Sequence, residues 1–382
     1  MTKVAVKPEI LRWARERAGL TVATLQDKFS SYTAWERGEK SPTFHQIEAL
    51  AKKTLTPLGF FFLSTPPEEK LPIPDFRTVD DSLSDRPSPN LLATVYAMQR
   101  RQDWMRDYLI ERGAEPLAFV GAAKVKDDPK KIAAQARKAL GLEPDWAKEH
   151  PTWQKALDSL RDAIEEAGVL TVINGVVENS TKRKLDVNEF RGFVLCDRHA
   201  PLIFVNGSDA KAAQMFTLAH ELAHLWLGQD ALFNFDRLQP AGFGVELFCN
   251  QVTAEFLAPE NDVRKAWPDV QAGVDRFDQL ARQFKVSSLV MARRALDLDL
   301  IDRSDFLSFY SDYMADERRK AQRQKPGGDF YNTQNNRVGK RFAEIVFRAA
   351  KEGSLLYRDA YRLTGLHGAA FTSYAERIGI RL

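Results

Sequence analysis

The sequence predicts an α+β fold, and three observations carry this prediction. Helical apolar periodicity runs through residues 7–63 and 88–141. A stretch that reads as short strands follows at 169–205, and two amphipathic helices come after it, at 208–228 and 244–259. Strands grouped together in an otherwise helical chain are typical of the α+β class. The 382 residues indicate two or three domains, at roughly 100 to 200 residues each.

Composition limits the class of protein further. Apolar residues make up 44% of the chain, which is enough for a sizeable core, and a net charge of +3 is too small to indicate nucleic-acid binding by itself. The sequence has two cysteines, Cys196 and Cys249, no charged-then-apolar leader, and no apolar run near the ~20 residues of a membrane span. We therefore expect a soluble, cytoplasmic protein with reduced thiols.

Residues 1–68 are expected to form a small helical domain. Helices are predicted from Pro8 to Ala18 and from Thr21 to Phe29, and another opens at 41–43 after the turn at 35–38. This order resembles the helix-turn-helix of lambda-repressor-like domains. Between Leu25 and Trp35 about four residues are missing relative to that motif, and the loss falls on the helix that enters the major groove.

Residues 30–33, which remain of that recognition helix, lack the Arg, Asn or Gln that normally reads base edges. Specific DNA binding is therefore doubtful, and a docking or regulatory domain is expected. The apolar run at 58–63 is too short to span a membrane and is expected to be a last helix packed on the core of this domain.

Residues 69–150 are expected to form a connector and a helical bridge. The proline-rich, charged part at 66–90 is typical of an extended linker. A long helix is predicted from Ser88-Pro89 to Gly113, and a shorter one begins at Asp128-Pro129 and ends at Gly141. We expect both to pack against the next domain instead of forming one of their own.

Residues 151–300 are expected to form a further domain, with both helices and strands. A helix is predicted from Trp153 to Ala167, followed by a β-rich stretch from Val169 to Val177. Arg191–Cys196 and Leu202–Val205 read as two strands joined by a turn. His199 lies in that turn and is expected to be solvated.

The helix at 208–228 carries the motif H-E-x-x-H as His220, Glu221 and His224. Residues at i and i+4 lie on one face, so both imidazoles can reach one metal ion while Glu221 points at its open side. Residues 206–208 are expected to supply a turn and an N-cap, and Gly228 to end the helix. Since the helix is apolar on both sides, the histidines must be buried with a polar partner. This indicates a zinc hydrolase; the alternative is a pair of hydrogen-bonded core histidines.

Catalytic zinc takes three protein ligands, so a third is expected beyond the two histidines. Glu246 lies among apolar residues of the helix at 244–259, where a carboxylate is costly unless it is paired. We expect Glu246 to be the third ligand, and Asn250, one turn further on, to orient a ligand. Glu255 is the competing candidate, on the opposite side of the same helix.

The segments FTLAHELAHLWLG and ELFCNQVTAEFLAP closely resemble the ImmA/IrrE family of metallo-endopeptidases. That family has a zincin helix followed by an E-x-x-x-N helix. The resemblance implies a zincin-type metalloprotease core with the metal ligands His220, His224 and Glu246 and the catalytic base Glu221. It also implies a protein substrate, a repressor-type helix-turn-helix transcription factor that is cleaved in a stress or mobile-element response. Zinc is the expected cofactor, although manganese accepts similar ligands.

Residues 301–382 are expected to form a helical C-terminal region. Before it, helices are predicted at Val274–Gln283 and Val286–Leu296. The segment 317–341 holds eight Lys or Arg and is expected to be a solvated linker, although such a run can also track phosphates. Helices on either side of Gly353, within 339–365, resemble the C-terminal appendix of the same family.

The sequence thus supports two functions. The first is a zinc-dependent endopeptidase in which Glu221 takes a proton from the attacking water. The alternative is a non-catalytic regulatory or antitoxin-like protein that retains the protease fold and binds DNA or protein through its N-terminal and basic segments. The intact motif together with Glu246 favours the endopeptidase, while the oligomeric state is left open.

Overall fold

The computed structural model describes residues 2–73, 87–233, 244–316 and 330–382. The chain divides into two compact units, one of Met1–Pro72 with Thr78–Tyr96 and the other of Ile73–Arg77 with Ala97–Leu382. Helix α5 (Pro89–Glu111) begins in the first unit and ends in the second. No helix of the described ranges has the length and apolarity needed to cross a membrane.

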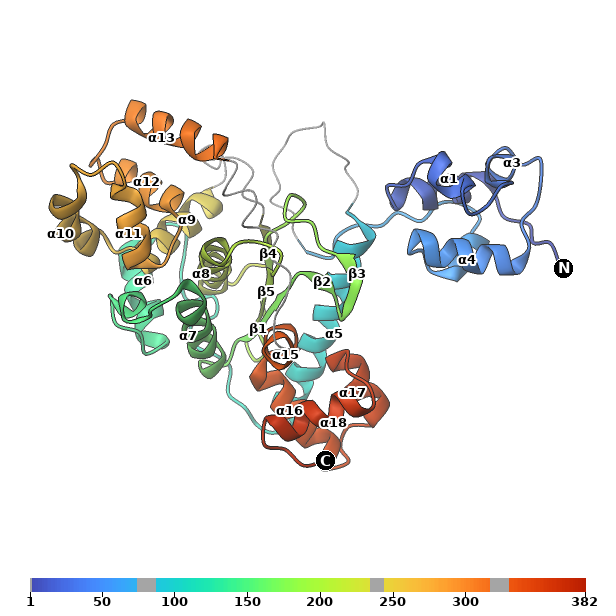
Figure 1. Ribbon diagram of the computed structural model, residues 1–382. Helices are drawn as coiled ribbons and strands as arrows, with labels where there is room; N and C mark the ends of the chain where they lie inside the picture. Colours follow the sequence, from blue (N-terminus) through green and yellow to red (C-terminus); the bar gives the residue numbers. More distant parts are fainter. Residues whose placement is uncertain (1, 74–86, 234–243, 317–329) are drawn as a thin grey trace. The chain divides into compact units, whose positions relative to one another are not determined.

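The first unit is helical (Figure 1, blue). Two of its helices begin after threonine caps: Thr21 accepts a hydrogen bond from the Thr24 N–H, and Thr43 forms a capping box with Gln46. The second helix ends at Gln26 and not, as predicted, at Phe29. The elements are α1 (Pro8–Arg17), α2 (Val22–Gln26), α3 (Tyr32–Glu36), α4 (Phe44–Thr54) and the 3₁₀ helix η1 (Leu58–Phe62).

Helix α3 covers the residues for which a shortened recognition helix was expected, and it has five residues. Two of them, Tyr32 and Trp35, are buried in the core of the unit. The Tyr32 hydroxyl donates to the carbonyl of Leu11 at 2.9 Å and to Glu36 at 2.8 Å. The largest side chains of α3 therefore stabilise the unit and do not project from it.

The phenylalanine run forms the 3₁₀ helix η1, and only part of it packs inward. Phe61 is fully buried, whereas Phe62 and Leu63 are 49% and 39% exposed. The prediction of a last helix packed on the core is therefore confirmed for Phe61 but not for the end of the run.

The second unit is built around a four-stranded sheet in the order β1-β5-β4-β6. Strand β1 (Leu170–Asn174) pairs in parallel with β5 (Leu202–Asn206), and β4 (Gly192–Leu195) pairs antiparallel with both β5 and β6 (Ala231–Phe233). The strands β1, β4 and β5 are buried along their whole length. The predicted strands are confirmed, and β2 (Val176–Val177) also falls in the β-rich stretch expected at 169–177. Strand β6 and the hairpin partner of β2, β3 (Ser180–Lys184), were not predicted.

Helix α8 (Lys211–Leu227) lies between the sheet and α9 (Gly244–Leu257), because it contacts β4, β5 and α9 (Figure 1). Every residue from Gln214 to Trp226 is buried, as its two apolar faces predict. The predicted N-cap at Ser208 is wrong: α8 begins at Lys211, after Ala210, and Ser208 belongs to a turn in which its N–H donates to Asn206.

The C-terminus of α8 is held by the segment before α6 (Pro129–Ala139). Gly228 ends the helix in the left-handed conformation, with φ of 69°. The N–H groups of Gly121 and Ala123 donate to the last carbonyls of α8, at 3.0 and 2.7 Å, and the Phe119 ring stacks on Trp226. The segment expected to be a helical bridge thus packs against α8.

The remaining helices enclose this core. The helix expected from Val274 begins at Arg276, Val274 itself is fully exposed, and α10 was not predicted. The break at Gly353 is confirmed. The linker expected at 317–341 is wrong for its second half: 330–338 form α15, which contacts β1 and buries Gln334 and Val338, and Lys340 begins α16. The basic residues at 317–329 lie outside the described ranges. The helices are α7 (Trp153–Glu166), α10 (Glu260–Val270), α11 (Arg276–Phe284), α12 (Ser288–Asp297), α13 (Arg303–Ala315), α15 (Phe330–Val338), α16 (Lys340–Lys351), α17 (Tyr357–Thr364) and α18 (Ala369–Arg377), with the 3₁₀ helix η2 (Trp146–Glu149).

The C-terminal helices are attached to the second unit through buried polar contacts. Arg101 of α5 donates to the carbonyls of Leu363 and Arg337, at 2.8 and 2.9 Å. Glu165 of α7 accepts the Arg341 N–H at 3.1 Å and so caps the first turn of α16. These contacts make α15 to α18 part of the second unit.

Candidate metal centre

The motif on α8 is buried in the interior of the second unit. His220, Glu221 and His224 are all 0% exposed. Because the two histidines are one turn apart, both rings point the same way, and their Nε2 atoms lie 3.1 Å from each other. Two imidazoles directed at one point are a typical start for a metal site.

Glu246, in the first turn of α9, brings a carboxylate to the same point. Its Oε2 lies 3.2 Å from His220 Nε2, and its Oε1 lies 3.2 Å from His224 Nε2. One donor atom from each of the three residues lies within 4.8 Å of the others, and in the described part of the chain this is the one such group of three. The structure thus joins the three residues that the sequence proposed as ligands.

Glu221 lies beside this group, against the sheet. Neither of its carboxylate oxygens has a hydrogen-bond partner among the described residues. Burial raises the pKa of Glu221 well above its ordinary value, and the charge of Glu246 raises it further. An isolated buried carboxylate is costly, so this residue is placed for a purpose other than stability.

The electrostatics of the three candidate ligands suit a cation. Burial opposes the charge of Glu246, but its hydrogen bonds to both histidines outweigh this effect and hold the pKa well below the usual range. Burial lowers the pKa of His224, which favours the neutral ring that binds metals. Two imidazole nitrogens and one carboxylate match the donor set of a catalytic zinc site. The residues therefore fit the metal that the motif implies.

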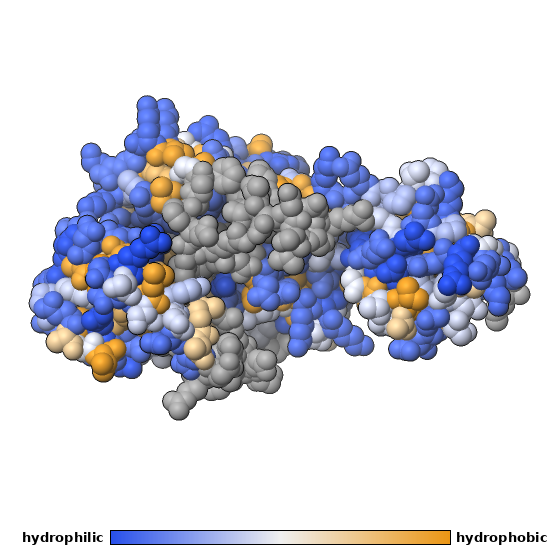
Figure 2. All heavy atoms as spheres, turned by 90° about the horizontal axis from the view of Figure 1, so that it is seen from above, coloured by the Kyte–Doolittle hydropathy of each residue, from blue (hydrophilic) through white to orange (hydrophobic). Residues whose placement is uncertain are grey.

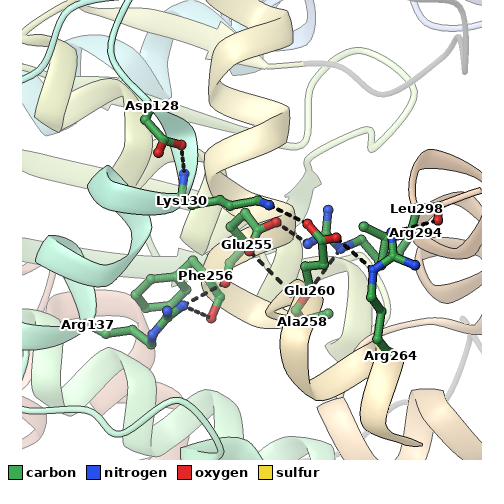
Figure 3. A network of polar contacts seen from close by, with 10 residues as sticks. All are labelled: Asp128, Lys130, Arg137, Glu255, Phe256, Ala258, Glu260, Arg264, Arg294 and Leu298. Carbon is green, nitrogen blue, oxygen red and sulfur yellow. Dashed lines mark hydrogen bonds and ion pairs between the residues drawn. The ribbon is translucent and has the colours of Figure 1, made fainter. Parts of the chain in front are cut away.

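Glu255 is excluded from this centre by its own contacts (Figure 3). Its carboxylate forms a buried ion pair with Arg294 of α12 and accepts the Glu260 N–H at 3.2 Å. Arg137 of α6 donates to the carbonyls of Glu255 and Phe256, at 2.6 and 3.1 Å. Both carboxylate oxygens of Glu255 are thus engaged at the far end of α9, away from the candidate metal ligands.

The other sequence candidates are not part of the ligand group. Asn250 lies one turn beyond Glu246, and its Oδ1 is buried without a hydrogen-bond partner among the described residues. This oxygen therefore makes no hydrogen bond to any of the three candidate ligands. The His199 N–H donates to Asp197 within the turn after β4, and its ring is outside the cluster.

One residue of the centre was not found from the sequence. Gly192 of β4 faces Glu221, and a Cβ atom there would lie 3.2 Å from Glu221 Oε1. A glycine inside a strand often marks a close approach, and this was the available signal.

A buried His-His-Glu group on two helices, with a glutamate between the histidines and a sheet behind them, defines a metallopeptidase-like centre. Residues 165–296 match the family model of a peptidase family, described as the IrrE N-terminal-like domain. The match runs from α7 to α12, includes the whole centre, and supports the resemblance to the ImmA/IrrE family. Residues 338–377, which cover α16 to α18, match a domain of unknown function (DUF8813). Comparison with curated protein sequences gives no match.

Proposed function

We propose that this protein is a zinc-dependent endopeptidase. The observation that carries the proposal is the convergence of His220, His224 and Glu246 within 4.8 Å, next to the buried and unpaired carboxylate of Glu221. A structural role alone would not require a second buried carboxylate beside the first. The match of residues 165–296 to a peptidase family supports the same reading.

In this proposal, His220, His224 and Glu246 hold the metal, and manganese is an acceptable substitute for zinc. When bound, the metal supplies a Lewis acid that lowers the pKa of water and polarises a carbonyl. Glu221 accepts the proton of the attacking water and returns it to the leaving amine. Its raised pKa suits this double role, since a strongly acidic carboxylate holds a proton poorly. Asn250, one turn beyond Glu246, is proposed to orient a ligand.

The proposed substrate is a protein, a repressor-type helix-turn-helix transcription factor cut in an extended linker. Strand β6 is an edge of the sheet and follows α8 directly in the chain. An extended segment can add to a sheet edge through main-chain hydrogen bonds, whereas a helix cannot. A linker between folded helices is therefore the segment of a repressor that suits this centre.

The test is Glu221→Gln, which keeps the size of the side chain and the three proposed ligands. The substituted protein should bind zinc as the wild type does but lose roughly 10²- to 10⁴-fold in rate, because the proton acceptor is gone. Each protein is co-expressed with a helix-turn-helix repressor encoded beside it, and the fragments are identified by mass spectrometry. Equal phenotypes for wild type and Glu221→Gln, with no cleaved partner under any inducing condition, would favour the non-catalytic regulatory function.

A further inference from the structure

Helix α13 (Arg303–Ala315) is attached to the second unit by one side only. Among its thirteen residues Phe306 alone is buried, whereas the twelve-residue α16 buries six. The attachment is aromatic: Phe306 belongs to the core of the unit, and the ring of Phe309 meets Phe277 of α11 at 4.7 Å. Figure 1 shows α13 outside α12, at the outer side of the helices next to α9.

The outward side of α13 consists of a central stripe and two flanks, which run parallel to the helix axis. With about 3.6 residues per turn, the residues opposite the aromatic side form a central stripe of small side chains. One flank of this stripe is apolar and exposed, with Leu307 at 50% and Met314 at 52%. The other flank carries the exposed residues Asp305 and Asp312, and within the described ranges neither carboxylate makes an ion pair. The stripe consists of Ser304, Ser308, Ser311 and Ala315.

The stripe and the two flanks each favour a different feature in a binding partner. Small side chains let the backbone of a second helix approach closely. Exposed Leu and Met lose contact with water when they are covered, which favours association. Unpaired carboxylates attract cationic side chains and repel acidic ones. The three together fit an amphipathic helix that has apolar residues along one flank and Lys or Arg along the other. Seen from above, this end of the unit shows small orange patches among blue residues (Figure 2).

A second copy of this chain fits the surface poorly. In a two-fold antiparallel pair of α13 helices each flank meets its own copy, because the interface is self-complementary. Asp305 and Asp312 of one copy would then face Asp305 and Asp312 of the other, and like charges on neighbouring helix positions are destabilising. The charge pattern therefore selects a partner that is basic where this chain is acidic.

We propose that the outward face of α13 docks a basic amphipathic helix of the protein that the metal centre cleaves. The inference rests on the proposed function and names its substrate more closely. DNA-binding domains carry a basic face to contact phosphates, so a helix-turn-helix repressor offers such a helix. Docking on α13 then holds the repressor while its linker reaches the centre, which raises the effective concentration of the scissile segment.

The first experiment measures docking without proteolysis. The probe is a fluorescein-labelled synthetic helix with two Leu on one flank, Ala in the middle and two Arg on the other, each pair two turns apart. Its fluorescence anisotropy is titrated with the full-length Glu221→Gln protein. Ser308→Trp should weaken binding roughly 10-fold or more, because it blocks close approach to the small stripe. Asp305→Asn with Asp312→Asn should weaken it about 5-fold, the size expected for two exposed ion pairs.

The controls match these changes elsewhere on the surface. Ser180→Trp adds the same bulk at an exposed serine of β3, and Asp27→Asn alters an exposed carboxylate of the first unit. Neither should change binding, and a probe with Glu in place of Arg should not bind. Equal affinity of wild type and Ser308→Trp for the basic probe would overturn the proposal.

The second experiment separates docking from catalysis. In wild-type background, Ser308→Trp should lower kcat/KM for an intact repressor about 10-fold, mostly through KM, and leave zinc content unchanged. An unchanged kcat/KM would overturn the proposed docking site. An increased kcat/KM would overturn it as well, because it would mean that a segment of this chain, and not the substrate, covers the outward face of α13. If no variant, including wild type, cleaves any repressor but the basic probe still binds through α13, the protease proposal fails while the docking surface stands.

Discussion

Gly192 of β4 lies directly against Glu221 of α8, with no room for a side chain between them. A Cβ atom at Gly192 would stand 2.5 Å from Thr217 Cγ2, 2.9 Å from the Phe204 carbonyl oxygen and 3.2 Å from Glu221 Oε1. The sheet therefore rests on the metal helix at the carboxylate proposed as the base. The missing side chain of Gly192 sets how close Glu221 comes to the strand.

We predict that Gly192→Ala displaces α8 and impairs the centre. Overpacking of this kind costs about 1 to 3 kcal/mol of folding free energy, and a displaced Glu221 should reduce kcat more than it changes zinc content. Thermal unfolding and zinc analysis measure the two effects. The double variant Gly192→Ala with Thr217→Ala removes the closest contact and should recover part of the stability. Wild-type stability and activity of the single variant would contradict this prediction.

The centre could largely be predicted because its signals are local. His220, Glu221 and His224 lie within one helical turn, so spacing alone puts the imidazoles together. Glu246 could be predicted as a ligand by a second argument, since a carboxylate among apolar residues must have a partner. The ion-pair partner of Glu255 could not be predicted, because Arg294 lies far along the chain and no local sequence pattern relates the two residues.

The elements that escaped prediction are short or depend on tertiary contacts. Strand β6 has three residues, too few to show a period, and forms because β4 offers it an edge. Helix α10 contains Pro268, which reads as a helix stop in sequence. The predicted N-cap at Ser208 is wrong because α8 begins only after Ala210, and the Ser208 hydroxyl donates to the Gly175 carbonyl at 3.2 Å instead.

A second prediction concerns the third ligand. Glu246→Ala should abolish stoichiometric zinc binding, because it leaves two histidines and no protein oxygen in the group. Glu255→Ala should retain zinc at a temperature where it is folded, since its carboxylate lies in a different network. Metal content of the purified proteins by mass spectrometry decides between them. Full occupancy of Glu246→Ala, with loss in Glu255→Ala, would reverse the assignment.

A third prediction concerns the first unit. Helix α3 directs Tyr32 and Trp35 into the core and is only five residues long, which leaves few side chains for base edges. The full-length protein should therefore bind duplex DNA weakly, without sequence preference and with a steep loss of affinity as salt rises. Anisotropy titrations with several unrelated duplexes at low and physiological salt provide the measurement. Nanomolar binding to one defined operator at physiological salt would show that α3 reads sequence after all.

The last prediction concerns the ion pair at the end of α9. Glu255 and Arg294 are both buried, and Arg294 also donates to the Ala258 carbonyl at 3.1 Å (Figure 3). Arg294→Met leaves the Glu255 carboxylate buried without its cation, and breaking a buried pair in this way typically costs about 3 to 5 kcal/mol. Replacing both, as Arg294→Met with Glu255→Leu, removes the unpaired charge and should restore most of that loss. Urea unfolding of the two single variants and the double variant gives the coupling free energy. If the double variant is as unstable as the sum of the single variants, the pair contributes nothing, and the bond of Arg294 to Ala258 carries the stability.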